Sequence, residues 1–83
     1  MKITEKIIVG NPSGLSLKNV SELVRLSNRF ESKITVLYRN LEVGTRSIRS
    51  LLDLEAIAGT ELTCCFEGRD AQAARDAYRE FFR

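Results

Sequence analysis

The order in which strand-like and helix-like patterns follow one another is the feature that most constrains the fold of this chain. Four short stretches alternate apolar and polar residues, as half-buried strands do, and three others repeat apolar residues at helical spacing. The patterns predict strands over about 2–9, 33–38, 41–43 and 62–66, and helices over about 17–30, 47–54 and 71–82. The predicted order is therefore β-α-β-β-α-β-α.

This order predicts an α+β two-layer sandwich, because four amphipathic strands need helices to cover one of their faces. The strands do not alternate regularly with helices, as a doubly wound sheet requires. A length of 83 residues suits one domain, residues 1–83. The chain contains no repeat, linker or low-complexity tract.

Local signals support the boundaries of these elements. Gly10–Gly14 is a dense turn signal, and Arg39-Asn40 fits a tight hairpin turn between the second and third strands. Ser16, Ser47 and Asp70 each stand where a helix should begin. Serine and aspartate are favoured there because their side chains accept hydrogen bonds from free N–H groups.

Composition excludes several classes of site. The chain has no histidine, so it offers no imidazole for a Ser-His-Asp or Cys-His catalytic arrangement, and we expect no enzyme. Its only cysteines, Cys64 and Cys65, are adjacent. We expect two reduced thiols, one that faces the core and one that faces the opposite side of the strand. Neither a metal site nor a cofactor site is expected.

Charge and hydropathy point to a cytoplasmic protein. Thirteen basic and eleven acidic residues give a net charge of +2, too even to predict nucleic-acid or membrane binding. No apolar run approaches the roughly 20 residues that span a bilayer. The amino terminus lacks the apolar stretch of a signal peptide.

Two of the helix starts have basic neighbours that suit an anion. Lys18 follows Ser16 by two positions, and Arg46 and Arg49 flank Ser47. A phosphate at either serine would meet free N–H groups and a cation. Helix capping alone is the simpler interpretation of both serines, and solvated side chains the simpler interpretation of the arginines.

The two helix starts also carry a family resemblance. Gly14-Leu15-Ser16-Leu17-Lys18-Asn19-Val20 is similar to the Gly-Leu/Ile-His-Ala-Arg-Pro-Ala signature of the HPr phosphocarrier family, and Arg46-Ser47-Ile48-Arg49-Ser50 to its Lys-Ser-Ile-Met-Gly stretch. The match runs nearly end to end. The resemblance implies an open-faced two-layer sandwich, with a four-stranded antiparallel sheet covered on one face by three helices.

The resemblance also implies roles for individual residues. Family members carry phosphate on the histidine of the first signature, between enzyme I and sugar-specific transport proteins. Here Ser16 stands at that histidine, Lys18 at the arginine that contacts the phosphate, and Asn19 at the proline. Ser47 stands at the serine that a dedicated kinase phosphorylates in many Gram-positive members. The chain thus resembles catabolite-repression HPr, which lacks the histidine but keeps the serine.

The departures from the family pattern favour regulation over phosphate transfer. A phosphoserine ester is far more inert than phosphohistidine, so Ser16 is a poor relay. We expect a regulatory binding protein, monomeric or weakly dimeric, that is switched at Ser47 and bound by an HPr kinase or a transcriptional regulator. Components of the phosphotransferase system are further candidate partners. The expected partner surface comprises Lys18, Arg46, Ile48, Arg49 and Leu52. The alternatives are an interaction domain without phosphorylation and a residual phosphocarrier that uses Ser16.

Overall fold

The computed structural model describes all 83 residues and contains seven regular elements. In chain order they are β1 (Lys2–Ile8), α1 (Leu17–Ser27), β2 (Lys33–Tyr38), β3 (Leu41–Gly44), α2 (Ile48–Leu52), β4 (Glu61–Glu67) and α3 (Ala71–Phe81). The predicted β-α-β-β-α-β-α order is confirmed.

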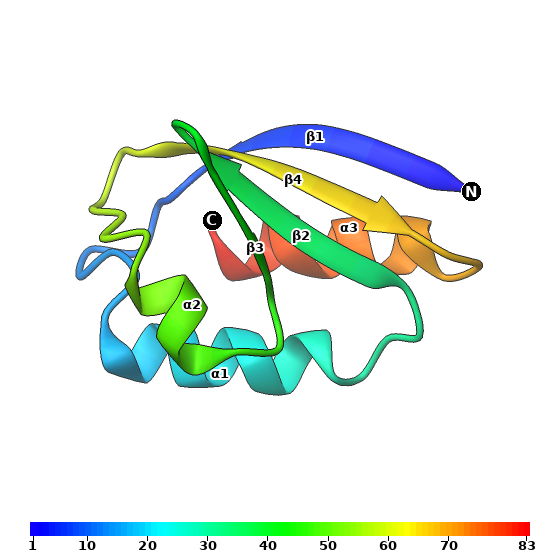
Figure 1. The fold of residues 1–83 in the computed structure, drawn as a ribbon, viewed down its shortest axis with the longest axis horizontal. Helices are drawn as coiled ribbons and strands as arrows, with labels where there is room; N and C mark the ends of the chain where they lie inside the picture. The colour runs from blue at the N-terminus through cyan, green and yellow to red at the C-terminus, as the bar shows by residue number, and fades with distance from the viewer.

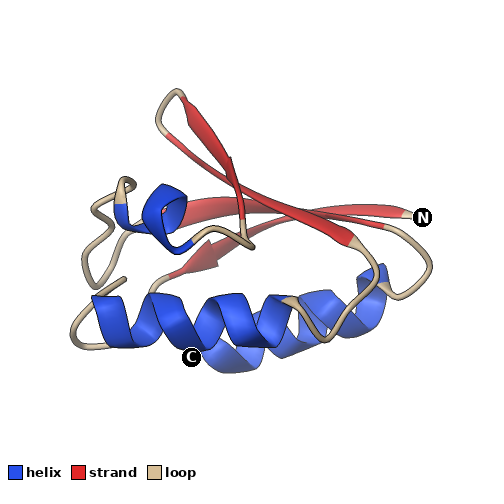
Figure 2. Cartoon of the chain, turned by 60° about the horizontal axis from the view of Figure 1, so that its bottom comes forward, coloured by secondary structure: helices blue, strands red, loops and turns tan.

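The four strands form one antiparallel sheet in the order β1-β4-β2-β3. Because β4 lies between β1 and β2, the last strand of the chain joins the first strand to the middle of the sheet. All three helices lie on the same side of the sheet (Figures 1 and 2), which leaves the other face open. The predicted α+β open-faced sandwich is therefore confirmed.

The core lies between the sheet and the helices, and it is centred on aromatic residues from β4 and α3. The ring of Tyr78 meets the ring of Phe66 edge to face, with 5.0 Å between their centroids, and also contacts Phe82. All three are almost completely buried. Cys64 and Val36 face each other across β4 and β2 and are fully buried as well. The alternation of the strand residues therefore points one set into this core.

One polar contact crosses the core. The hydroxyl of Ser27, at the end of α1, donates to the carbonyl of Leu23 at 2.7 Å and contacts the hydroxyl of Tyr78. Burial raises the pKa of Tyr78 to about 12, since the charged phenolate would be poorly solvated there. The contact ties α3 to α1 through groups that water does not reach.

Two predicted helix ends are wrong. α1 ends at Ser27, not near residue 30, because the N–H groups of Arg29 and Phe30 donate to the carbonyls three residues back, at 3.1 and 3.2 Å, instead of continuing the four-residue spacing of an α-helix. α2 ends at Leu52, so Leu54 lies beyond the helix, although it is buried as its apolar side chain predicts. Apolar spacing marks buried positions but does not show where the backbone bonds stop.

Asp70 precedes α3 as predicted, but its side chain does not cap that helix. Its carboxylate instead accepts hydrogen bonds from the backbone N–H groups of Glu31 and Ser32, at 2.8 and 2.9 Å, and from the Ser32 hydroxyl. The bond from the Ser32 hydroxyl, followed by that from Glu31, lowers the pKa of Asp70. The capping prediction fails because a better set of donors lies on a distant loop.

The predicted hairpin turn and the expected free cysteines agree with the structure. Tyr38 pairs with Leu41, so Arg39 and Asn40 form a two-residue hairpin turn. Cys64 is buried, Cys65 is half-buried, and both thiols are free. No helix combines the length and the apolar character needed to cross a membrane. No group of three or more histidine, cysteine or acidic residues is placed to bind a metal ion.

Candidate functional site

Ser16 is the N-cap of α1. Its backbone is extended, with φ −68° and ψ 166°, and its hydroxyl oxygen accepts a hydrogen bond from the N–H of Asn19 at 3.3 Å. The hydroxyl of Ser13 lies 3.4 Å from it. Ser16 is half-buried, and its hydroxyl oxygen already accepts a hydrogen bond from the first turn of the helix.

Asn19 fixes the loop in front of Ser16. Its side-chain amide donates to the carbonyl of Gly14 at 2.7 Å and to the hydroxyl of Ser13 at 3.0 Å. Hydrogen bonds therefore join Ser13, Ser16 and Asn19 into a closed group, which we call the polar ring at the start of α1. Sequence reasoning noted Asn19 only as a departure from the family proline; its amide, which can donate two bonds, was the available signal.

The same loop is held against the segment between α2 and β4. The N–H of Leu15 donates to the carbonyl of Ala56 at 2.9 Å. Gly14 has a positive φ of 61°, and a Cβ there would lie only 2.6 Å from that carbonyl oxygen. This close approach helps to bring the N-terminal end of α1 beside α2, and the two helices pack together.

Ser47 is the N-cap of α2. Its hydroxyl oxygen accepts a hydrogen bond from the N–H of Ser50 at 3.2 Å, and its backbone is extended, with φ −119° and ψ 116°. The residue is exposed. The structure therefore places both candidate serines at helix starts, as predicted, with Ser47 the more accessible of the two.

Four of the five residues of the expected partner surface lie at or near the outside of the helix pair. Lys18 and Arg49 are exposed and form no salt bridge, Ile48 is 40% exposed, and Leu52 is half-buried. The structure adds Leu17, which is 62% exposed in the first turn of α1. Sequence reasoning missed it as a surface residue. Its position directly after Ser16 was the signal that could have found it.

Arg46, the fifth residue, is placed differently. Its guanidinium bonds the C-terminal end of α1 and the loop that follows, through the carbonyls of Ser27, Phe30 and Ser32 and the side chain of Asn28. The guanidinium is thus occupied within the chain. Of the two arginines that flank Ser47, Arg49 is the one whose guanidinium has no partner within the chain.

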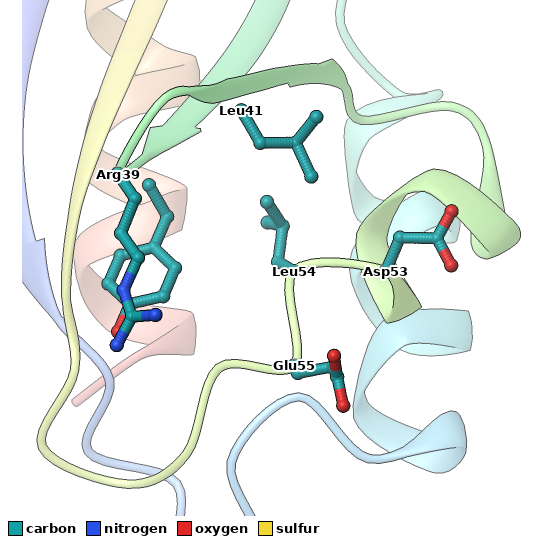
Figure 3. A pocket seen from close by; sticks show the side chains of 6 residues that line it. Arg39, Leu41, Asp53, Leu54 and Glu55 are labelled. Atoms are coloured by element: carbon teal, nitrogen blue, oxygen red, sulfur yellow. The ribbon is translucent and has the colours of Figure 1, made fainter.

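A pocket of about 250 Å³ lies apart from both serines, between the β2–β3 hairpin and the segment after α2 (Figure 3). The guanidinium of Arg39 sits 5.1 Å from the centre of the Tyr38 ring at one side. Asp53 and Glu55 lie at the other, with Leu54 between the two sides. Neither serine lines this pocket.

Comparison with known families identifies the family of the chain. The model of the family described as "PTS HPr component phosphorylation site" matches residues 3–83. The chain belongs to the HPr family. This is a family of phosphocarrier proteins of the phosphotransferase system, and the HPr member in hand has no histidine anywhere in its sequence.

Individual relatives agree with this placement. The phosphocarrier protein HPr of Xylella fastidiosa (strain 9a5c) is 30% identical over 80 residues, which cover 96% of this chain and 90% of the relative. The HPr-like protein Crh of Bacillus subtilis is 31% identical over 72 residues, or 87% of this chain and 85% of Crh. The crystal structure of an HPr from Bacillus anthracis superposes with a TM-score of 0.94, covers 99% of this chain and 98% of its own, and shares 24% identity; it shows the same fold.

Proposed function

We propose that this chain is a regulatory binding protein of the HPr family, switched by phosphorylation of Ser47, and that it does not relay phosphate. The observation that carries the proposal is a family match across nearly the whole chain in a sequence without histidine. Phosphate transfer by members of the family requires a labile phosphohistidine, and this chain cannot form one. A serine ester is too stable to serve as its replacement.

The surroundings of the two serines favour Ser47 over Ser16 as the modified residue. Ser47 is exposed, and its oxygen accepts one hydrogen bond, from Ser50. Ser16 is half-buried and lies within the polar ring closed by Asn19. A kinase must bring a nucleotide phosphate in line with the hydroxyl, which is easier at an exposed side chain.

The chemistry near Ser47 suits a phosphate and a protein partner. The guanidinium of Arg49 is exposed and unpaired, and a guanidinium forms strong, charge-assisted bonds with phosphate. Ile48, Leu52 and Leu17 supply exposed or half-exposed apolar area on the two helices. We propose that an HPr kinase recognises this surface and that a transcriptional regulator binds its phosphorylated form.

A second candidate function is an interaction domain that is never phosphorylated. Arg49 favours it, because in the family this position is a methionine within an apolar docking surface. A cation there suits an acidic partner surface even without a phosphate on Ser47. Lys18, which is also exposed, adds a second cation to such a surface.

Intact mass spectrometry of the purified protein distinguishes these functions. One reaction contains enzyme I and phosphoenolpyruvate, and the other contains a Gram-positive HPr kinase and ATP. We expect one phosphate from the kinase alone, lost in Ser47→Ala and kept in the matched variant Ser16→Ala. No phosphate in either reaction would contradict the switch and favour the interaction domain. A phosphate from enzyme I, lost in Ser16→Ala, would restore a carrier role.

A further inference from the structure

The side chain of Arg46 connects the residue before Ser47 to the end of another helix. Its Nη2 donates to the carbonyl oxygens of Phe30, Ser27 and Ser32, at 2.7, 3.3 and 3.4 Å. Its Nε donates to Oδ1 of Asn28 at 3.1 Å. Figure 1 shows the link from β3 to α2 passing along the second half of α1, which brings Arg46 within reach.

These bonds place the Arg46 cation at the C-terminal end of α1, where a positive charge stabilises a helix. The last carbonyls of a helix have no partners within it, and the helix dipole places negative charge at the same end. The segment 28–32 belongs to no helix or strand, so its polar backbone groups need other partners. Arg46 supplies hydrogen-bond donors to the carbonyl groups of Phe30 and Ser32 in this segment.

Asp70 holds the other part of the same segment. It accepts from the N–H groups of Glu31 and Ser32, whereas Arg46 binds mainly residues 27–30. The two charged side chains therefore restrain adjoining parts of one loop, which meet at Ser32, where Arg46 reaches the carbonyl and Asp70 accepts from the N–H. Losing the Arg46 bonds should loosen residues 28–30 and leave the N–H groups of Glu31 and Ser32 in place.

The backbone on both sides of Arg46 is fixed, so only its side chain can change partners. Thr45 is 1% exposed, and both its N–H and its hydroxyl donate to the carbonyl of Ile34, at 3.2 and 3.3 Å. Ser47 caps α2 on the other side. The Arg46 side chain itself is exposed, and bonds made at an exposed site cost little to exchange.

We propose that Arg46 is a positioning residue that couples the state of Ser47 to the C-terminal end of α1. Without phosphate, its guanidinium holds residues 27–30. A phosphate on Ser47, the adjacent residue, draws the guanidinium away, because it offers a full negative charge and several acceptor oxygens, whereas each backbone carbonyl offers only a dipole. Arg49 binds the same phosphate from the other side. This inference rests on the proposed modification of Ser47 and adds its structural consequence.

The test installs phosphoserine at position 47 during translation, so that no kinase is needed. Amide proton exchange is measured by NMR for Asn28, Arg29 and Phe30, with Glu31 and Ser32 as internal references. We expect phosphoserine to speed exchange at 28–30 by about two- to fivefold, the range of a lost cation at a helix end. Arg46→Met should give the same increase without phosphate, and the matched variant Arg49→Met should not.

Combining the changes decides whether Arg46 carries the effect. In Arg46→Met, phosphoserine should produce no further increase, because the bonds that it would break are already absent. An equal increase in both backgrounds, or no increase in the otherwise unchanged protein, would overturn the coupling. The Nε–H resonance of Arg46 gives a direct second measurement, since it must shift when its bond to Asn28 is lost.

The outcome can be separated from that of the proposed function. If a kinase fails to modify Ser47 but the phosphoserine protein shows faster exchange at 28–30, the coupling stands and the kinase switch does not. If the kinase modifies Ser47 and exchange at 28–30 is unchanged, the switch stands and the coupling through Arg46 is wrong.

Discussion

Removing the hydroxyl of Ser27 should destabilise this protein more than removing the hydroxyl of Tyr78, although the two groups share one contact. Ser27 donates its proton to the carbonyl of Leu23, so its oxygen accepts the proton of Tyr78. In Tyr78→Phe, Ser27 keeps its bond to Leu23. The variant therefore loses one buried hydrogen bond, worth about 1 kcal/mol.

In Ser27→Ala the hydroxyl of Tyr78 loses this acceptor while the residue stays completely buried. The hydroxyl of Thr45 also lies near it, but its hydrogen bond goes to the carbonyl of Ile34 and not to Tyr78. An unsatisfied buried polar group costs about 1–3 kcal/mol. Alanine also favours the helix by about 0.5 kcal/mol, which opposes the loss. Ser21→Ala, a half-buried position in the same helix, measures that gain separately.

Urea unfolding monitored by circular dichroism measures the difference. A small domain loses about 1 kcal/mol per molar urea, so the midpoint of Ser27→Ala, corrected with Ser21→Ala, should fall by about 1–3 M. The midpoint of Tyr78→Phe should fall by about 1 M. A larger loss in Tyr78→Phe than in Ser27→Ala would show that the assigned direction of the hydrogen bond is wrong.

Two further predictions concern pH and the loop before Ser16. The free energy of unfolding should decrease above pH 9, because burial raises the pKa values of Cys64 and Tyr78 to about 12 and only the unfolded chain then ionises readily. Urea titrations from about pH 8 to 11 test this, and stability that does not change with pH would contradict it. Gly14→Ala should cost more than about 1 kcal/mol, because it adds a clash with the Ala56 carbonyl to the strain of a positive φ. The matched variant Gly59→Ala, also at positive φ but with open space around its Cβ, should lose less in the same unfolding assay.

The candidate site could be located from the sequence because capping is a local property. A serine accepts bonds from N–H groups two or three residues ahead, so Ser16 and Ser47 could be placed at helix starts without knowing the fold. Which serine is more accessible could not be predicted. The Ser16 hydroxyl contacts both Asn19 and Ser13, whereas the Ser47 hydroxyl oxygen accepts one hydrogen bond, from Ser50.

Arg46 and Asp70 show what local reasoning could not reach. Asp70 was expected to cap α3 and instead binds the loop at 28–32, and Arg46, a residue of the expected partner surface, makes hydrogen bonds to the same loop. Asp70 and Glu31 are 39 positions apart, and Arg46 and Phe30 are 16 apart. A charged side chain binds the unpaired backbone groups that packing brings to it, and no spacing within the sequence reports their position.

The type and order of the seven elements could be predicted from residue patterns, since the period of the apolar residues differs between strands and helices. The sequence also determined that no phosphohistidine can form, since it contains no histidine. The three-dimensional fold was needed to show that β4 lies between β1 and β2, and that the Arg46 side chain reaches the end of α1. These are contacts between distant segments, and they exist only once the helices pack on the sheet.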